Sequence, residues 1–510
     1  MERKWWSLLA VCLATFMLLL DITIVNVALP DIATALDASF SDLQWVVDAY
    51  ALMLAALLLT AGSLADLLGR RRVFAFGLVC FTVASVLCAL APSALTLILA
   101  RGAQGIGGAA MFATSLALLA QEFHGRERGT AFGIWGATTG AAVAIGPLVG
   151  GALTSGLGWP SIFYLNLPIG LATIAMTLRH VPESRDEEAV GVDWAGLVTF
   201  SAALFLLVFA LIRGNDEGWT STPIVAMLAV SALLLVAFVA IEDAQPRPMF
   251  DLELFRKRTF SGVSIAAFVL SASMFAMFLY ITLYVQTILG YGPLDTGLRF
   301  LPLTVLSFFA AAVAGKLTAR LPARAMLGTG LVLVGGGLLL MRGLDADSRW
   351  TALLPGFVVA GIGIGLTNPS LANTAIGVVT PARSGMASGI NSTFRQVGIA
   401  TGIAGLGAIF QSQIADRLTT ALAGTPAAGD VDALARAVSA GGAPQAIDAA
   451  PPAGRPALHH AIDAAFAGGL NDLFLVAAVV AFAGAAVALV LVRRSDFVVL
   501  AAPVPQPEQA

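Results

Sequence analysis

The segments QWVVDAYALMLAALLLTAGSL (44–64), ADLLGRRR (65–72) and VFAFGLVCFTVASVLCALA (73–91) decide the fold class. The first and third are apolar runs of the length, roughly 20 residues, that a helix needs to cross a bilayer. The link between them is short and contains three consecutive arginines. Two apolar runs joined by a short basic turn predict a pair of transmembrane helices that reverses direction on the cytoplasmic side.

The same pattern continues along the whole chain. Its 510 residues are 58% hydrophobic and 12% charged, whereas soluble domains carry roughly 25% charged residues. Lipid offers no water to satisfy the backbone of long apolar runs, so each run must be a helix. Hydropathy predicts fourteen such spans, at 5–29, 44–64, 73–91, 95–121, 129–155, 160–179, 194–213, 222–241, 260–288, 297–317, 325–342, 351–377, 385–410 and 468–492. The predicted class is an all-α integral membrane protein.

The basic residues indicate the orientation of this topology. One side holds Arg70–Arg72, residues 256–258 and both chain ends, and the other side holds fewer, widely spaced arginines. The positive-inside rule then places both termini in the cytoplasm, and an odd number of spans would destroy this sorting. We expect a location in the cytoplasmic (inner) membrane. The alternative at the N-terminus is a cleaved signal peptide, but the run Trp5–Leu29 is too long for one and contains Asp21.

Several functional classes lack their sequence signatures. The net charge of −3 gives no argument for nucleic-acid binding. Lys316 does not belong to a phosphate-binding loop, because Leu317 stands where a Ser or Thr would meet magnesium. His459 and His460, in the long predicted outer loop 411–465, have too few companions for a metal site. We therefore expect no enzyme, no use of ATP, and no metal or other cofactor.

A weak internal repeat indicates how the chain is organised. The segment 62–66 (GSLAD) follows the second span and leads to arginines, and the segment 315–320 (GKLTAR) follows the tenth span in the same way. Transporters are commonly built from such repeats, with the binding site between them. The expected organisation is a six-helix bundle (1–180), an inserted helix pair with flanking loops (181–258), a second six-helix bundle (259–495) that contains the loop 411–465, and a cytoplasmic tail (496–510). Short amphipathic pieces are expected within that loop at 431–438 and 458–466.

Ionisable residues inside apolar spans are costly and usually functional. Asp21 in the first span and Arg101 in the fourth have opposite charges and matching depths. Burial favours a protonated carboxyl group and a neighbouring Arg favours the ionised form, so a movable Arg101 would load and unload a proton on Asp21. The alternative is a static ion pair. Asp48 is either a cavity carboxylate or a helix-start residue that faces headgroup water, and Arg395 lies in the middle of the thirteenth span.

Two glycine-containing segments are further candidates for a functional role. In the turn after the second span, Gly62 and Gly69 allow a tight reversal, and Asp66 could meet a neighbouring helix terminus or Arg in only one conformation. Positive-inside anchoring alone explains Arg70 and Arg71. The fifth span contains small residues at helical spacing, which let two backbones approach closely, and a proline that can kink the helix. These residues are Gly136, Gly140, Gly146, Pro147, Gly150 and Gly151.

These segments resemble the motifs of the major facilitator superfamily, in its fourteen-helix drug:proton antiporter branch (the EmrB/QacA type). The matching segments, in the family's order, are LDITIVNVALP (20–30), GSLADLLGRRR (62–72), RGAQGIG (101–107) and the segment 136–151 with its glycines and Pro147, which resembles the family's antiporter motif. The resemblance extends over residues 5–492. Two positions depart from the pattern: an expected Arg before Ile162 is missing, and Asp48 stands where the family usually has an uncharged residue.

The resemblance implies the major facilitator fold, with two six-helix bundles plus two inserted helices. It also implies proton-driven efflux, with Asp21 and Arg101 as proton-coupling residues and a gating motif of Gly62, Asp66, Gly69, Arg70 and Arg71. We expect export of small amphipathic molecules (drugs, antibiotics or toxic metabolites) by alternating access. The alternatives are a proton-coupled importer and a lipid or metabolite flippase on the same fold, and a membrane-fusion partner is left open. Candidates for the substrate cavity, chosen by position, are Asn26, Asp48, Gln104, Tyr280, Tyr284, Gln286, Asn391 and Arg395.

Overall fold

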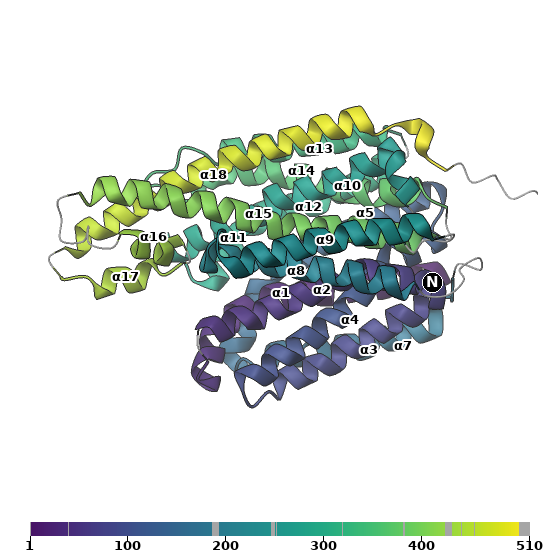
Figure 1. Ribbon diagram of the computed structural model, residues 1–510, viewed down its shortest axis with the longest axis horizontal. Helices are drawn as coiled ribbons and strands as arrows, with labels where there is room; N and C mark the ends of the chain where they lie inside the picture. The colour runs from purple at the N-terminus through teal and green to yellow at the C-terminus, as the bar shows by residue number, and fades with distance from the viewer. Residues whose placement is uncertain are drawn as a thin grey trace, which may run out of the picture.

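The structure is a computed structural model, and it describes residues 2–38, 40–185, 193–245, 250, 252–318, 320–380, 383–423, 431–439, 441–452 and 454–498. All regular elements in these ranges are helices (Figure 1). The N-terminal helices are α1 (Arg3–Leu36), α2 (Phe40–Leu68), α3 (Arg70–Ala89), α4 (Ala94–Glu122), α5 (Gly125–Leu157), α6 (Ser161–Tyr164) and α7 (Asn166–His180). An inserted hairpin, α8 (Trp194–Glu217) and α9 (Thr222–Ala244), follows them.

The C-terminal helices form the second bundle. They are η1 (Leu252–Arg256), α10 (Arg258–Leu270), η2 (Ser271–Phe275), α11 (Ala276–Leu283), η3 (Tyr284–Ile288), α12 (Pro293–Leu317), α13 (Ala323–Leu340), η4 (Trp350–Leu353), α14 (Leu354–Gly377), α15 (Ser384–Ala421), α16 (Val431–Ser439), α17 (Ala443–Ala449), α18 (Arg455–Leu491) and η7 (Arg494–Asp496). The segments η2 and η3 are single π-helical turns inside the span that runs from α10 to η3. Such turns are rare and are frequent at functional sites.

The predicted spans agree with these helices. Thirteen helices of the described residues are long and apolar enough to cross a membrane. The remaining predicted span, 129–155, is α5, in which the described segment Leu148–Leu157 is a shorter apolar helix. The chain therefore folds as an all-α, multi-pass membrane protein of two bundles and an inserted pair.

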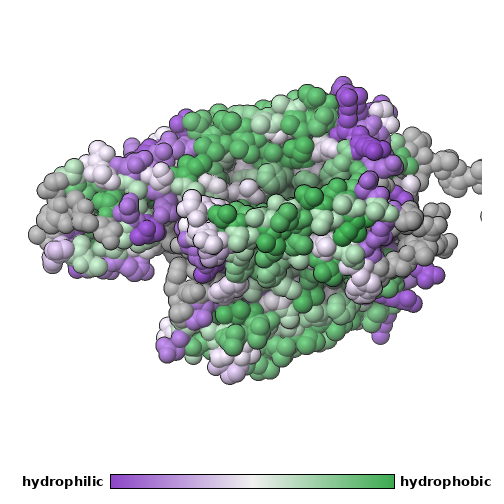
Figure 2. Space-filling model, in the orientation of Figure 1, coloured by the Kyte–Doolittle hydropathy of each residue, from purple (hydrophilic) through white to green (hydrophobic). Residues whose placement is uncertain are grey.

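The surface has the distribution of polarity that a bilayer requires. Figure 2 shows a continuous hydrophobic belt over the middle of the helices, with hydrophilic residues concentrated towards the two ends. Large apolar side chains are exposed within the spans, among them Leu99 (66%), Phe309 (61%) and Val236 (69%). Lipid would cover them, because such side chains are unfavourable in water.

One end of the molecule, here named the terminal face, carries the start of α1 and the end of α18, and the other, the lobe face, carries α16 and α17 (Figure 1). The predicted loop 411–465 is wrong in its extent. Helix α15 continues to Ala421, and α18 already begins at Arg455. The apolar side chains Phe410, Ile414 and Leu418 repeat every four residues and are fully buried, so this part of α15 packs within the lobe instead of ending at the membrane. The predicted helical pieces 431–438 and 458–466 are confirmed within α16 and α18.

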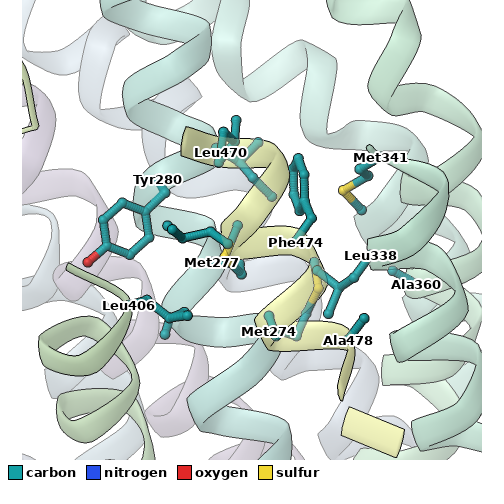
Figure 3. Close-up of a cluster of buried hydrophobic side chains, with 14 of the residues drawn as sticks. Met274, Met277, Tyr280, Leu338, Met341, Ala360, Leu406, Leu470, Phe474 and Ala478 are labelled. Atoms are coloured by element: carbon teal, nitrogen blue, oxygen red, sulfur yellow. The ribbon is translucent and has the colours of Figure 1, made fainter. Parts of the chain in front are cut away.

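The C-terminal bundle has its own apolar core. Figure 3 shows Met274, Met277, Leu338 and Phe474 meeting from the α10–η3 span, α13 and α18. The N-terminal bundle has two clusters, one of which also includes Ala372 and Ile376 of α14. The surface along which the two bundles touch, here named the seam, is formed mainly by α2 against α15 and by α5 against α12. The inserted helix α8 packs against both α2 and α15.

Candidate functional site

Asp21 lies deep inside the N-terminal bundle and is 1% exposed. Its Oδ2 accepts a hydrogen bond from Arg101 Nη1 at 2.5 Å. Its Oδ1 accepts from Gln104 Nε2 at 3.2 Å and from Asn166 Nδ2 at 2.8 Å. The predicted pairing of Asp21 with Arg101 is therefore present, and donors from α4 and α7 hold the carboxylate away from solvent.

Arg101 is held as firmly as its partner. Its Nε donates to the Val46 carbonyl at 3.0 Å and its Nη1 to Gln104 Oε1 at 2.7 Å. The guanidinium carbon lies 4.4 Å from the centre of the Tyr50 ring, which is the geometry of a cation–π contact. With Asp21 ionised, the pair is electrically neutral. Removing one partner of a buried pair costs about 3–5 kcal/mol, because an unbalanced charge remains.

Asn166 is a site residue that the sequence prediction missed. Its amide donates to Asp21 and, at 2.9 Å, also to Ser85 Oγ. It is 1% exposed. Charge within an apolar span was the signal for Asp21 and Arg101, and Asn166 is neutral. A search for any amide within an apolar span would have found it.

Asp66 joins the two bundles at the terminal face. Its carboxylate accepts hydrogen bonds from the backbone N–H groups of Gly385 (3.1 Å) and Met386 (2.7 Å), at the start of α15. It also binds Arg70 Nε and Nη2 at 2.9 and 2.7 Å. The first N–H groups of a helix have no partner inside the helix, and the N-cap Arg383 supplies none from its side chain. Asp66 therefore caps a helix of the opposite bundle.

Glycines bring the backbones together at this seam. A Cβ on Gly62 would lie 2.6 Å from the Gly385 carbonyl oxygen. On the other side of the molecule, Gly315 at the end of α12 meets Gly129 at the start of α5 just as closely. The two halves of the internal repeat thus make equivalent contacts, α2 on α15 and α12 on α5. Only the first carries an acidic residue, because position 319 of the sequence is Ala where the first repeat has Asp66.

The basic turn after α2 is fixed by a residue that was not predicted. Gly69 has φ 111°, a conformation that other residues rarely adopt. The Arg71 N–H donates to Glu183 Oε1 at 3.0 Å, and the Arg70 N–H donates to the Ser184 carbonyl at 2.8 Å. The segment after α7 therefore holds this turn in place. No pattern in the sequence pointed to Glu183.

The glycines of α5 have two different sets of partners. Gly146 and Gly150 lie against Thr23 and Ile24 of α1, directly after Asp21. Nearer the terminal face, Gly136 and Gly140 face the C-terminal bundle: a Cβ would lie 3.0 Å from Pro369 Cγ in α14 and 3.7 Å from Ser307 Oγ in α12 respectively. Gly151 has no neighbour within 4 Å at its Cβ position. The side chain of Pro147 lies outside the described residues.

The predicted cavity residues do not form one group. Gln104 belongs to the Asp21 network. Tyr280 lies at the edge of the C-terminal core in Figure 3, and its hydroxyl donates to the Ile403 carbonyl at 2.6 Å. The Tyr284 ring stacks on Phe466, and Gln286 is half-buried in the π-helical turn η3.

Four predicted cavity residues remain. Trp45 and Leu52 of α2 belong to an apolar cluster that packs against α8. Asp48 lies on the same face of α2 and therefore at the side of the inserted hairpin. The side chain of Asn26 lies outside the described residues. Arg395 and Asn391 are buried on α15.

This arrangement defines a class of protein. The glycine contacts and the Asp66 hydrogen bonds across the seam join residues 58–66 to 385–389 and residues 129–140 to 307–318 and 369, so the two bundles are closed against each other towards the terminal face. Two bundles that meet through one polar cap and closely packed glycines can separate and close again. A multi-pass protein of this design is a membrane transporter of the alternating-access type.

Comparison with known proteins gives the family. Residues 11–403 match the family model of the Major Facilitator Superfamily. The chain is 38% identical over 414 residues to the multidrug resistance protein Stp of Mycobacterium tuberculosis, covering 81% of this chain and 77% of the relative. It is 33% identical over 496 residues to the tetracenomycin C resistance and export protein of Streptomyces glaucescens, covering 96% and 91%. The chain therefore belongs to the Major Facilitator Superfamily.

Solved structures agree on the fold. The human organic anion transporter MFSD10 superposes with a TM-score of 0.60 at 15% identity, covering 94% of this chain and 100% of that chain. At this level of identity the likeness concerns the fold alone. The predicted resemblance and fold class are confirmed.

Proposed function

We propose that the protein exports small amphipathic molecules across the cytoplasmic membrane in exchange for protons. The observation that carries the proposal is the buried, charge-balanced Asp21–Arg101 pair in one bundle, together with a seam that Asp66 closes at the terminal face. The names of its relatives, which include multidrug resistance and antibiotic export proteins, support efflux. The importer and flippase alternatives have no comparable support.

The positive-inside rule makes the terminal face cytoplasmic. In that orientation the structure corresponds to the state that is closed towards the cytoplasm. Protonation of Asp21 from the outside would leave Arg101 as an unbalanced buried cation, so the pair would have to rearrange. Arg101 is bonded to Val46 of α2, and α2 carries Asp66. A rearrangement at the pair would therefore act on the helix that holds the seam closed.

The available energy is sufficient for useful export. One proton that crosses 100 mV supplies about 2.3 kcal/mol. At about 1.4 kcal/mol per tenfold, this sustains a gradient of roughly fortyfold for a neutral substrate. A pH gradient adds to it.

The test is transport by purified protein in liposomes, with a panel of amphipathic drugs and dyes and an imposed pH gradient. We expect uptake into inside-acid vesicles for protein inserted with its terminal face outward. Collapse of the gradient should stop concentrative transport. Asp21→Asn should remove the dependence on the pH gradient, and Asp31→Asn, an exposed residue at the lobe end of α1, is the matched control. Transport against a concentration gradient with no proton movement would contradict the proposal.

A further inference from the structure

Arg395 is a buried cation in the first half of α15. It is 9% exposed. Its Nη1 donates to Asn368 Oδ1 at 3.0 Å, and its guanidinium carbon lies 5.7 Å from the centre of the Phe275 ring. The other guanidinium nitrogens have no hydrogen-bond partner among the described residues. One amide oxygen cannot satisfy a group with five N–H donors.

Among the described residues, the two other arginines that are less than a tenth exposed are each balanced by an acid. Arg70 pairs with Asp66, and Arg101 pairs with Asp21. Arg395 has no carboxylate within ion-pair distance in the described ranges. Burying a charge without a counter-charge is expensive, and inside a membrane protein such a residue usually marks a substrate or ion pathway. A purely structural role would be served by a neutral amide at lower cost.

A second observation points to the same kind of ligand. One turn before Arg395, on the same face of α15, the Asn391 side chain is 2% exposed, and its Nδ2 donor has no partner. Residues four apart on a helix are neighbours on its surface. The two side chains therefore present hydrogen-bond donors side by side, and an acceptor with negative charge would satisfy both.

The position of this pair fits a transport pathway. Helix α15 packs against α2 and α4 of the opposite bundle. Asn368, the partner of Arg395, directly precedes Pro369, whose ring meets Gly136 of α5 at the seam. Phe275, the aromatic neighbour of Arg395, ends the π-helical turn η2. The charge thus lies next to the surface along which the bundles separate, beside an apolar ring.

We propose that Arg395, with Asn391, binds an oxygen anion, a carboxylate or phenolate, on the exported molecule, while Phe275 contacts its apolar part. This inference rests on the proposed efflux function and names its substrate class: amphipathic organic anions. A guanidinium group binds a carboxylate through two parallel hydrogen bonds, which a lysine cannot reproduce. Arg395 is thereby a specificity-determining residue of the C-terminal bundle.

An electrical consequence follows. Export of a monoanion in exchange for one proton moves two elementary charges inward per cycle, whereas export of a neutral molecule moves one. Transport of anions should therefore depend more steeply on the membrane potential than transport of neutral compounds. If an acid is transported in its protonated, neutral form, its transport should depend on the membrane potential no more steeply than transport of a neutral compound.

The experiment uses full-length protein in liposomes with potassium–valinomycin potentials and an imposed pH gradient. The probes are amphipathic dyes in three charge states: coumarin carboxylates, their uncharged carboxamides, and quaternary ammonium derivatives of the same ring. We expect the wild type to export the carboxylates. Arg395→Gln should lower their kcat/KM by at least about tenfold, mainly through KM, with changes below about twofold for any neutral or cationic dye that is exported. Arg395→Lys should retain part of the carboxylate export, and Arg349→Gln, an exposed arginine at the lobe face, should retain all of it.

The outcomes are separable. Export of neutral or cationic dyes without carboxylates would overturn the inference and leave the efflux proposal intact. An equal loss of every exported class in Arg395→Gln would make the residue structural and would also overturn it. Carboxylate export with the potential dependence of a neutral compound would exclude anion binding. No proton-driven export of any probe would count against both the efflux proposal and the inference, which rests on it.

Discussion

Asp66→Asn tests the polar contact across the seam. Two of the hydrogen bonds to Asp66, from the Gly385 and Met386 N–H groups, exist only when the bundles are closed at the terminal face. The bonds to Arg70 lie within one bundle and persist in both states. Hydrogen bonds to charged groups contribute about 1.5–3 kcal/mol each. Asparagine loses the charge and offers one acceptor oxygen, so we expect the closed state to lose about 2–4 kcal/mol, a shift of roughly 30- to 700-fold in the equilibrium.

The assay measures the population of the closed state directly. Spin labels are placed at Leu68→Cys, a 49% exposed residue at the end of α2, and at Thr380→Cys, exposed beside α14. The three native cysteines are first replaced by alanine. The distance distribution of the parent in nanodiscs should contain a short component for the closed seam. In Asp66→Asn this component should fall and a longer one should grow.

The control is Asp31→Asn, which makes the same chemical change at an exposed site on the lobe side of α1. It should leave the distribution unchanged. If Asp66→Asn also leaves the distribution unchanged while thermal stability is intact, the cap on α15 does not determine the conformation. If substrate affinity falls severely with normal cycling, Asp66 has a role in binding and the reasoning fails.

Three further changes probe the same framework. Arg101→Ala leaves Asp21 as an unpaired buried charge, so we expect loss of export and a destabilisation of about 3–5 kcal/mol, measured by transport and detergent unfolding; normal export would exclude the coupling pair. Asn166→Leu removes one donor from Asp21, and we expect a loss of about 1–3 kcal/mol in the same unfolding assay; wild-type stability would show that the bond is dispensable. Gly62→Ala should reduce the closed spin-label population by at least about tenfold, because the added methyl group meets the Gly385 carbonyl at 2.6 Å; Gly336→Ala, with no atom within 4 Å, is its control, and equal effects of the two would contradict the packing argument.

Hydropathy predicted the membrane spans because the solvent decides them: a helix in lipid must present apolar residues over its whole crossing length. Hydropathy gave the wrong end for α15, which continues into the lobe. The apolar stripe of Phe410, Ile414 and Leu418 lies in a segment of low overall hydropathy, so α15 appeared to end at the bilayer. The four-residue spacing of the stripe is typical of a helix with one buried face, and this signal was not used in the prediction. The average hydropathy of a segment indicates whether the segment lies in lipid. It does not indicate where the helix ends.

The site residues that were predicted are those that carry a charge within an apolar span. The site residues that were missed lack this signal. Asp21 and Arg101 stood out because ionised groups are rare in apolar spans. Asn166 and Glu183 did not, since one is neutral and the other lies in a polar segment. The partner of Asp66 is a pair of backbone N–H groups of residues 385 and 386, more than 300 positions along the chain. Only the three-dimensional packing of the bundles brings these groups together.

Helix α5 gives the two parts of the site a physical connection. It is one helix from Gly125 to Leu157. Towards the lobe face, Gly146 and Gly150 pack on the residues of α1 that follow Asp21, and towards the terminal face Gly129 packs on α12 across the seam. A helix is stiff along its axis, so a shift of α1 after protonation of Asp21 would tilt α5 and separate it from α12. Because glycine contacts have no side chains to rearrange, the separation needs no repacking of rotamers. Glycines at both ends of α5 fit this connection: Gly146 and Gly150 contact α1, which carries Asp21, and Gly129 contacts α12 where the seam would open.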